Sequence, residues 1–217
     1  MTSLTAYTSY ADAQAHFAGA KLWDLFDGDR ESLNIAHECI DRHVDGERTA
    51  IIVVRADGPD EVLSFREIAE DSARFGHWLV AQGIAAGDRV AIMLEPSRAY
   101  YAAMFGTIKA GAIAVPLFTL FGPDGVKLRI DDCAPRLLVT NAEKAPLIAP
   151  KVATRVVVAD EVFMADLASL PARFEANTRS DALAIFQYTS GTTRELPEAV
   201  KHTHRALVTL MVAALYG

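Results

Sequence analysis

Residues 89–117 read RVAIMLEPSRAYYAAMFGTIKAGAIAVPL, and this stretch decides the fold class. Residues 89–94 form a continuous apolar run, which is typical of a strand that is covered on both sheet faces. Ser97 then opens a run with helical spacing, and Gly111 follows its end. Residues 112–117 return to an apolar run. A strand, a helix and a second strand in this order predict a βαβ unit with parallel strands.

The segments before this unit predict a hairpin and two helices. Residues 49–55 (TAIIVVR) and 61–65 (EVLSF) are extended runs separated by ADGPD, a turn signal, so we expect an antiparallel hairpin from residue 49 to residue 65. Ser64 and Glu67 have the spacing of a capping box at the start of the next helix. Further upstream, apolar spacing from residue 33 predicts a helix with Ser32 as the candidate cap.

The segments after the unit continue the alternation. Residues 136–140, 155–158 and 183–188 are expected to be short strands, whereas 159–180 gives a weak signal of helix and loop. The prediction is an α/β fold with a largely parallel sheet flanked by helices and a β-hairpin. No repeat or linker marks a domain boundary, so residues 1–217 are expected to be one unit.

Composition excludes several classes of protein. The chain has 217 residues, of which 51% are hydrophobic and 23% are charged, as in ordinary globular proteins. A net charge of -7 argues against binding to nucleic acid, which requires clustered Lys and Arg. Cys39 and Cys133 give no disulfide framework, and neither a secretory signal nor a run long enough to span a membrane is present. These features favour a cytoplasmic protein.

The segment that carries chemistry is 183–207, LAIFQYTSGTTRELPEAVKHTHRAL. A predicted strand ends at Tyr188, a loop dense in hydroxyls and glycine follows, and helical spacing resumes from Thr203. Ligands of open α/β sheets bind outside the carboxyl ends of the strands, and successive N–H groups of a glycine-bearing loop can hold an anion. An ordinary Ser/Thr/Gly loop is the local alternative. The Walker pattern G-x-x-x-x-G-K-[ST] is absent.

YTSGTT, followed by Pro197 and HTHRAL, resembles the phosphate-loop signature of the adenylate-forming superfamily, which includes acyl-CoA synthetases. The resemblance extends over most of the chain, from LSFREIAEDSARFGHWLVAQGIAAGDRVAIML to the next helix–strand units. PLFTLFGP, residues 116–123, is similar to acetyl- and medium-chain acyl-CoA synthetases and aryl-CoA ligases. The resemblance implies the incomplete N-terminal domain of an acyl-CoA synthetase-like fold.

The resemblance implies a two-step reaction in which a carboxylate attacks ATP to give an acyl-adenylate and coenzyme A then displaces AMP. Mg²⁺ would neutralise the leaving phosphates. The residues expected to hold the phosphates are Thr189, Ser190, Gly191, Thr192 and Thr193. No catalytic residue is assigned.

The loop departs from the family signature after TSGTT. It is one residue longer before the proline, and Arg194, Glu198 and Ala199 stand where the family places Gly, Lys and Gly. Arg and Ala tolerate positive φ less well than Gly, so the path of the loop should differ. Glu198 reverses a charge near the triphosphate, and Arg194 or Lys201 could supply the cation instead. A weakened ATP site is the alternative.

The family's ribose-binding, acyl-pocket and small C-terminal-domain segments are expected downstream and do not occur in these 217 residues. The chain alone is therefore expected to be inactive and to self-associate through apolar surface. Two alternatives remain: a truncated, non-catalytic paralogue that acts as an interaction module, and an adenylation domain that loads a carrier protein. His202 and His204 are expected to be structural or exposed, and Asp131 and Asp132 to form a solvated helix face.

Overall fold

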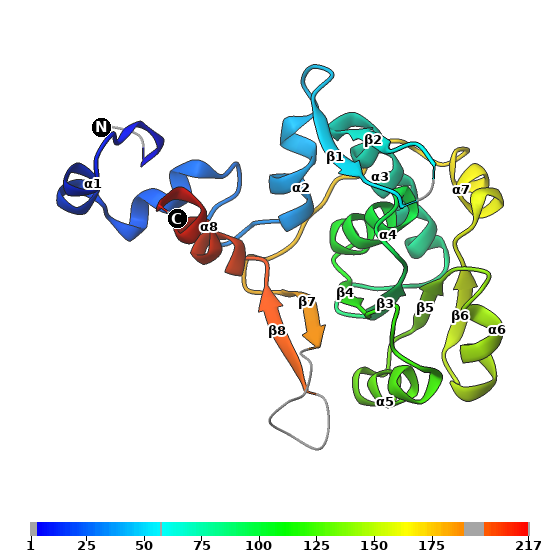
Figure 1. Ribbon diagram of the computed structural model, residues 1–217. Helices are drawn as coiled ribbons and strands as arrows, with labels where there is room; N and C mark the ends of the chain where they lie inside the picture. Colours follow the sequence, from blue (N-terminus) through cyan, green and yellow to red (C-terminus); the bar gives the residue numbers. More distant parts are fainter. Residues whose placement is uncertain (1–3, 57, 189–197, 217) are drawn as a thin grey trace.

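The computed structural model describes residues 4–56, 58–188 and 198–216. A sheet with helices on both faces forms the body of the molecule, and a smaller lobe at the N-terminal end lies beside it (Figure 1). A two-stranded hairpin lies at the top of the helical layer in this view.

The six-stranded sheet has the order β6-β5-β3-β4-β7-β8. Its strands are β3 Arg89–Met93, β4 Ile113–Pro116, β5 Leu137–Thr140, β6 Arg155–Val158, β7 Leu183–Tyr188 and β8 Ala199–Thr203. All neighbours pair in parallel except β7 and β8, which are antiparallel. The βαβ unit and the largely parallel sheet expected from residues 89–117 are confirmed.

Successive residues of β3 face opposite layers, because side chains alternate along a strand. Val90 and Ile92 pack in the core shared with the helices α3 (Phe65–Ala81) and α4 (Arg98–Lys109). Ala91 and Met93 pack in the second core with α5 (Pro123–Cys133) and α6 (Ala145–Ile148), which continues into η4 (Ala149–Lys151). Helix α7 (Glu161–Leu167) packs on the α3 side. The central strands are thus buried on both faces, as their unbroken apolar sequence predicts.

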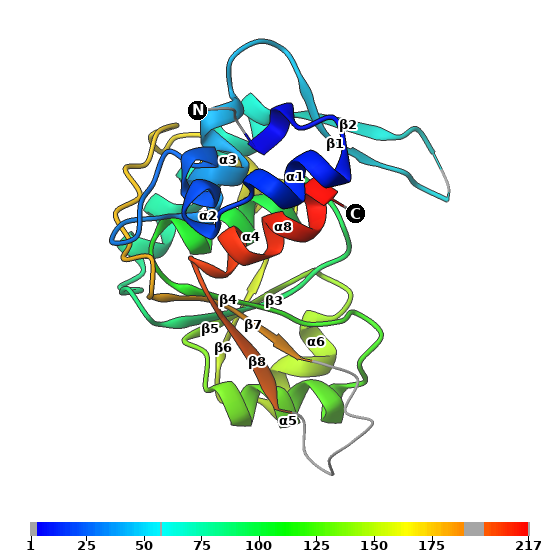
Figure 2. The same ribbon diagram turned by 90° about the vertical axis from the view of Figure 1, so that its left-hand side faces the viewer.

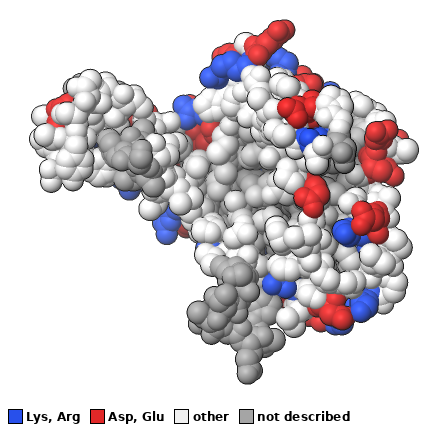
Figure 3. Space-filling view, in the orientation of Figure 1, with Lys and Arg blue, Asp and Glu red and all other residues white. Residues whose placement is uncertain are grey.

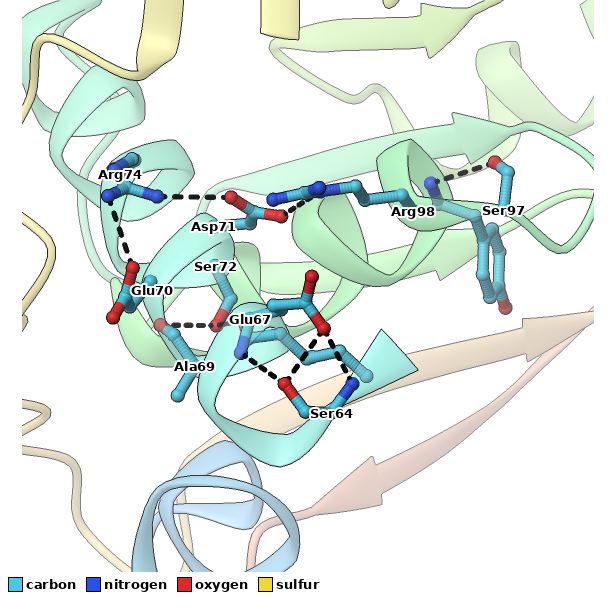
Figure 4. A network of polar contacts seen from close by, with 11 residues as sticks. Ser64, Glu67, Ala69, Glu70, Asp71, Ser72, Arg74, Ser97 and Arg98 are labelled. Atoms are coloured by element: carbon cyan, nitrogen blue, oxygen red, sulfur yellow. Dashed lines mark hydrogen bonds and ion pairs between the residues drawn. The ribbon is translucent and has the colours of Figure 1, made fainter. Parts of the chain in front are cut away.

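Helix α3 begins where the hairpin ends. The hairpin pairs β1 (Thr49–Val53) with β2 (Glu61–Ser64) in antiparallel register. The Ser64 side chain accepts from the Glu67 N–H, and the Glu67 carboxylate accepts from the Ser64 N–H, so the predicted capping box is present (Figure 4). On the same helix, Asp71 pairs with Arg74 and with Arg98 of α4, which joins α3 to α4.

The helix predicted from residue 33 is shorter than expected and has a different cap. It comprises α2 (Ile35–Cys39), followed by the 3-10 turn η3 (Asp41–His43). Asn34, not Ser32, caps it, because the Asn34 carboxamide oxygen accepts from the N–H groups of Ala36 and His37. An asparagine directly before the first helical residue is better placed for this bond than a serine three residues upstream.

The N-terminal lobe combines the two ends of the chain. It consists of η1 (Leu4–Ala6), α1 (Tyr10–His16), η2 (Gly19–Leu25) and α8 (Ala206–Tyr216), with the blue N-terminal and red C-terminal segments together at one end of the molecule (Figures 1 and 2). Both η1 and α8 contact η2. Val208 of α8 is buried against the first part of the chain, in a cluster with Leu4, Leu22 and Leu33. Trp23, Leu25 and Phe26 pack on this cluster, so aromatic and apolar residues anchor the N-terminal segment.

Candidate functional site

At the neighbouring strands β3 and β4, successive connections run over opposite faces of the sheet. The connection from β3 to β4 passes through α4 on one face, and the connection from β4 to β5 passes through α5 on the other. The carboxyl ends of β3 and β4 therefore border the crevice at which open α/β sheets bind their ligands.

Two polar residues at these strand ends contact each other. Glu95 follows β3 and Thr119 follows β4, and the Thr119 hydroxyl donates to the Glu95 carboxylate. Thr119 is buried, whereas Glu95 is exposed. The sequence assigned no role to either residue, although Glu95 directly follows the predicted strand 89–94 and Thr119 lies two residues after the predicted strand 112–117.

Beside this pair, two large apolar side chains of the segment after β4 are open to solvent. Phe118 is 61% exposed and Leu120 is 79% exposed. Phe121 of the same segment turns inward and packs on the second core. Because exposed aromatic and aliphatic side chains next to a switch-point crevice can contact an apolar ligand, this segment belongs to the candidate site.

The third component is the end of β7. Tyr188 is its last residue and pairs with Ala199, the first residue of β8. The carboxyl end of β7 and the start of β8 therefore lie side by side. Thr189, Ser190, Gly191, Thr192, Thr193 and Arg194, which the sequence predicts to contact phosphate, lie outside the described residues.

Strand β8 was not predicted. The sequence indicates a helix from Thr203 onward, but residues 199–203 form a strand and the helix begins at Ala206. The pattern AVKHT is short and partly polar, as suits an edge strand that is covered on one face only. The correction matters because it places Lys201 on a strand, two residues from the start of β8.

Lys201 is the one predicted site residue that the structure describes. It is exposed and lies opposite Phe186 of β7, with Nζ 5.3 Å from the centre of that ring. This is a cation–π distance for an exposed lysine, and it orients the ammonium over β7.

His204 has a structural environment. It is fully buried, and its Nδ1 accepts from the Ile35 N–H at 3.2 Å. Nε2 has no hydrogen-bond partner among the described residues, and burial lowers the pKa of the imidazole to about 4. A neutral, buried histidine that joins α2 to the start of α8 agrees with the structural role expected from the sequence.

The described part of the chain contains no group of three His, Cys, Asp or Glu side chains that could hold a metal ion. It also contains no helix that is both long and apolar enough to cross a membrane.

The family described as "AMP-binding enzyme" matches residues 40–216. The acetyl-coenzyme A synthetase of Bacillus subtilis (strain 168) is 32% identical over 195 residues, which cover 81% of this chain and 33% of that enzyme. The 3-hydroxybenzoate--CoA/4-hydroxybenzoate--CoA ligase of Thauera aromatica is 32% identical over 199 residues, with 82% of this chain and 36% of that enzyme covered.

Among solved structures, the acyl-CoA synthetase of Brucella canis superposes with a TM-score of 0.83 at 30% identity, over 94% of this chain and 39% of that one. The chain thus spans only about a third of the length of these relatives.

Proposed function

The chain belongs to the AMP-binding enzyme family, and on that premise we propose that it is the N-terminal part of the large adenylating domain of an AMP-forming acid–CoA ligase. The complete protein converts a carboxylate and ATP to an acyl-adenylate and pyrophosphate, then transfers the acyl group to coenzyme A. Its relatives include an acetyl-coenzyme A synthetase and a hydroxybenzoate–CoA ligase. The proposal places the complete protein in the cytoplasm, where ATP and coenzyme A are available.

The observation that carries this proposal is the position of the hydroxyl-rich segment. Residues 189–193 follow directly after Tyr188, the carboxyl end of a strand that neighbours β4 in a parallel sheet. Hydroxyl and backbone N–H donors at such an edge suit the binding of ATP phosphates. Thr189, Ser190, Gly191, Thr192 and Thr193 supply these donors in the proposal. Mg²⁺ then enters with the nucleotide, since its usual ligands are substrate phosphates together with few carboxylates.

The cation of the site is proposed to come from Arg194 or Lys201, because Glu198 stands where the family signature has lysine. The exposed position of Lys201 near the start of β8 supports it as one candidate.

The acceptor is proposed to be coenzyme A rather than a carrier protein. Two observations support this. The PLFTLFGP segment is similar to segments of CoA ligases, and the relatives named above are a CoA synthetase and a CoA ligase.

ATP–pyrophosphate exchange in the complete protein tests the proposed function. Exchange should appear only when a carboxylic acid is added, with acetate and 4-hydroxybenzoate as the first acids to compare. The 217-residue chain alone should show no acid-dependent exchange, because most of the groups that hold the reactants in attack geometry belong to later parts of the relatives. Absence of exchange in the complete protein across aliphatic and aromatic acids would overturn the assignment.

A further inference from the structure

A cavity of about 380 Å³ lies between α2, η3, α3 and the segment 172–175. It also reaches Lys109, the last residue of α4, whereas the switch-point crevice lies at the carboxyl ends of β3 and β4. Among the described residues, none that lines the cavity belongs to that crevice or to the end of β7. Its volume falls in the range of small-molecule sites in proteins. The cavity is therefore a candidate site separate from the one described above.

The wall formed by residues 172–175 is fixed by contacts to α3. His77 Nε2 donates to the Arg173 carbonyl at 2.7 Å, and the rings of His77 and Phe174 lie 4.8 Å apart, centre to centre. A Cβ at Gly76 would lie 3.1 Å from the Phe174 ring, so the ring rests on the helix where no side chain stands. Because these contacts do not need a ligand, the wall is pre-formed, as is usual for binding sites.

A buried cation forms part of the base of the cavity. Lys109 is only 2% exposed, and its Nζ lies 2.6 Å from the Asp41 carboxylate and donates to the Ala69 carbonyl at 2.8 Å. All three residues line the cavity. An ammonium has three N–H donors, and the third has no acceptor among the residues that the structure describes. One charged donor is thus left without a partner beside the cavity.

Two guanidinium groups at the rim have no counterion. Arg66 and Arg173 line the cavity and are exposed, and neither forms an ion pair with a carboxylate in the described ranges 4–56, 58–188 and 198–216. The Arg66 guanidinium donates to the Val44 carbonyl at 3.1 Å. Each guanidinium keeps further N–H donors in the planar arrangement that matches the two oxygens of a carboxylate.

The carboxylates of the lining do not cancel this charge. Asp41 is occupied by Lys109, and Glu70 pairs with Arg74 at 3.3 Å. Glu175, the remaining carboxylate of the lining, forms no ion pair within the described part of the chain. Two rim arginines against one such carboxylate leave the cavity with a net positive charge, so electrostatic complementarity favours an anion.

We propose that this cavity binds a small organic carboxylate, which is held by Arg66 and Arg173 at the rim and by Lys109 at the base. The apolar body of the ligand lies against the apolar residues of the wall, which are Val44, Ala69, Ala73 and Phe174. The proposal goes beyond the proposed function and does not depend on it, because the cavity shares no described residue with the switch-point crevice.

The test is the binding of 4-fluorobenzoate to the 217-residue chain, followed by the broadening of the ligand's fluorine NMR signal at pH 7.5. A ligand of this size in an open site should bind with a Kd on the order of 1 mM. 4-Fluorobenzamide has nearly the same shape but no charge. It should bind at least about 5-fold more weakly, because it loses the charge-assisted hydrogen bonds.

Arg66→Gln and Arg173→Gln each remove one guanidinium from the rim. Both side chains are exposed, so both variants should fold, and thermal unfolding checks this. Each should raise the Kd for 4-fluorobenzoate about 3- to 10-fold, and Arg66→Lys, which keeps the charge, should recover part of the affinity. Glu175→Gln removes the competing carboxylate and should lower the Kd about 2-fold.

Arg155→Gln is the matched control. Arg155 is also exposed, but it lies on the edge strand β6 and does not line the cavity. Its loss should leave the Kd for 4-fluorobenzoate unchanged.

Three results would overturn the proposal. The first is no saturable binding of 4-fluorobenzoate up to about 20 mM, well above the expected Kd. The second is wild-type affinity in both Arg66→Gln and Arg173→Gln, since the ligand would then bind elsewhere on the chain. The third is equal affinity for 4-fluorobenzamide, which would show that the site does not select a carboxylate. None of these results bears on the proposed ligase function, which ATP–pyrophosphate exchange tests separately.

Discussion

His204 shows at the residue scale how a buried side chain makes stability depend on pH. Its pKa is lowered from 6.5 to about 4 by burial. Above pH 6.5 the imidazole is neutral in both the folded and unfolded states, so it adds no pH dependence. Between pH 6.5 and about 4 the unfolded state takes up the proton more readily, so the free energy of unfolding falls as the pH falls.

The His204 contribution to this loss should reach about 3 kcal/mol at pH 4. His204→Asn keeps an acceptor for the Ile35 N–H but cannot be protonated. Urea unfolding at pH 7.5, 6 and 4.5 should therefore show a smaller loss of stability for the variant than for the wild type. Parallel losses in both proteins would show that the imidazole does not control the pH dependence.

Lys109 provides a second prediction at this scale. Its side chain is 2% exposed, Nζ lies 2.6 Å from the Asp41 carboxylate, and it also donates to the Ala69 carbonyl. Burial lowers the pKa of Lys109, and Asp41 opposes that shift. Asp41→Asn leaves the buried ammonium without its counterion and should destabilise the fold by about 2–4 kcal/mol, since Asp41 itself is partly solvated.

Lys109→Met is compared with Asp41→Asn. It removes the ion pair with Asp41 and also the buried ammonium itself. It should cost less than Asp41→Asn, because no unpaired charge remains inside. Chemical denaturation of both variants measures the difference. A larger loss for Lys109→Met would contradict this account of the pair.

Residues differ in how far the sequence predicts their roles. The Ser64–Glu67 capping box was predictable because both partners lie within one helical turn. The partners of His204 and Tyr188 lie 169 and 56 residues away, so only the fold brings them together. Asp132 was expected on a solvated helix face, and it is exposed, yet its carboxylate also holds Tyr188. Roles set by distant contacts are not encoded in local spacing.

At the scale of elements, the close crossing of α3 and α4 requires a glycine at position 106. A Cβ at Gly106 would lie 2.6 Å from the Ser72 carbonyl oxygen and 2.9 Å from Phe75. Because the first of these atoms is backbone, the helices would have to move apart. Gly106→Ala should destabilise the protein by about 1–3 kcal/mol despite alanine's better helix propensity.

Gly19→Ala is the control for Gly106→Ala, since a Cβ at Gly19 meets nothing within 4 Å. Thermal unfolding should show a clear drop in Tm for the first variant and almost none for the second. Equal Tm values for the two variants would mean that the helices accommodate the methyl group.

Elements with a clear hydrophobic pattern and with turn or capping residues at their ends were predictable from the sequence, whereas β8 was not. The strand from 155 to 158 and the strand from 183 to 188 were predicted with their observed bounds. The five residues of β8 are mostly polar or exposed, and their strand conformation comes from pairing with β7 rather than from a hydrophobic pattern.

At the scale of the whole molecule, the N-terminal lobe is the candidate surface for the expected self-association. On the face shown in Figure 3, Lys, Arg, Asp and Glu are sparse over this lobe, at the left, and denser over the body of the molecule, at the right. Tyr10 is 78% exposed and Leu210 is 62% exposed there. We propose that the chain associates with itself through this surface, since exposed apolar side chains grouped on one lobe favour association.

Leu210→Glu should shift the sedimentation coefficient of the chain toward that of a monomer at high protein concentration. Val62→Glu, at an equally exposed site on the hairpin, should not. A wild-type chain that sediments as a monomer at all concentrations would contradict the proposed association.

The central claim is that the segment after Tyr188 binds the phosphates of ATP for adenylate formation. ATP–pyrophosphate exchange at subsaturating ATP in the complete protein tests it most directly, with Thr192→Ala and Thr193→Ala compared with the wild type. Loss of a hydrogen bond to a charged phosphate costs about 1.5–3 kcal/mol, so each variant should lower exchange roughly 10- to 150-fold. Wild-type exchange in both variants would contradict the claim.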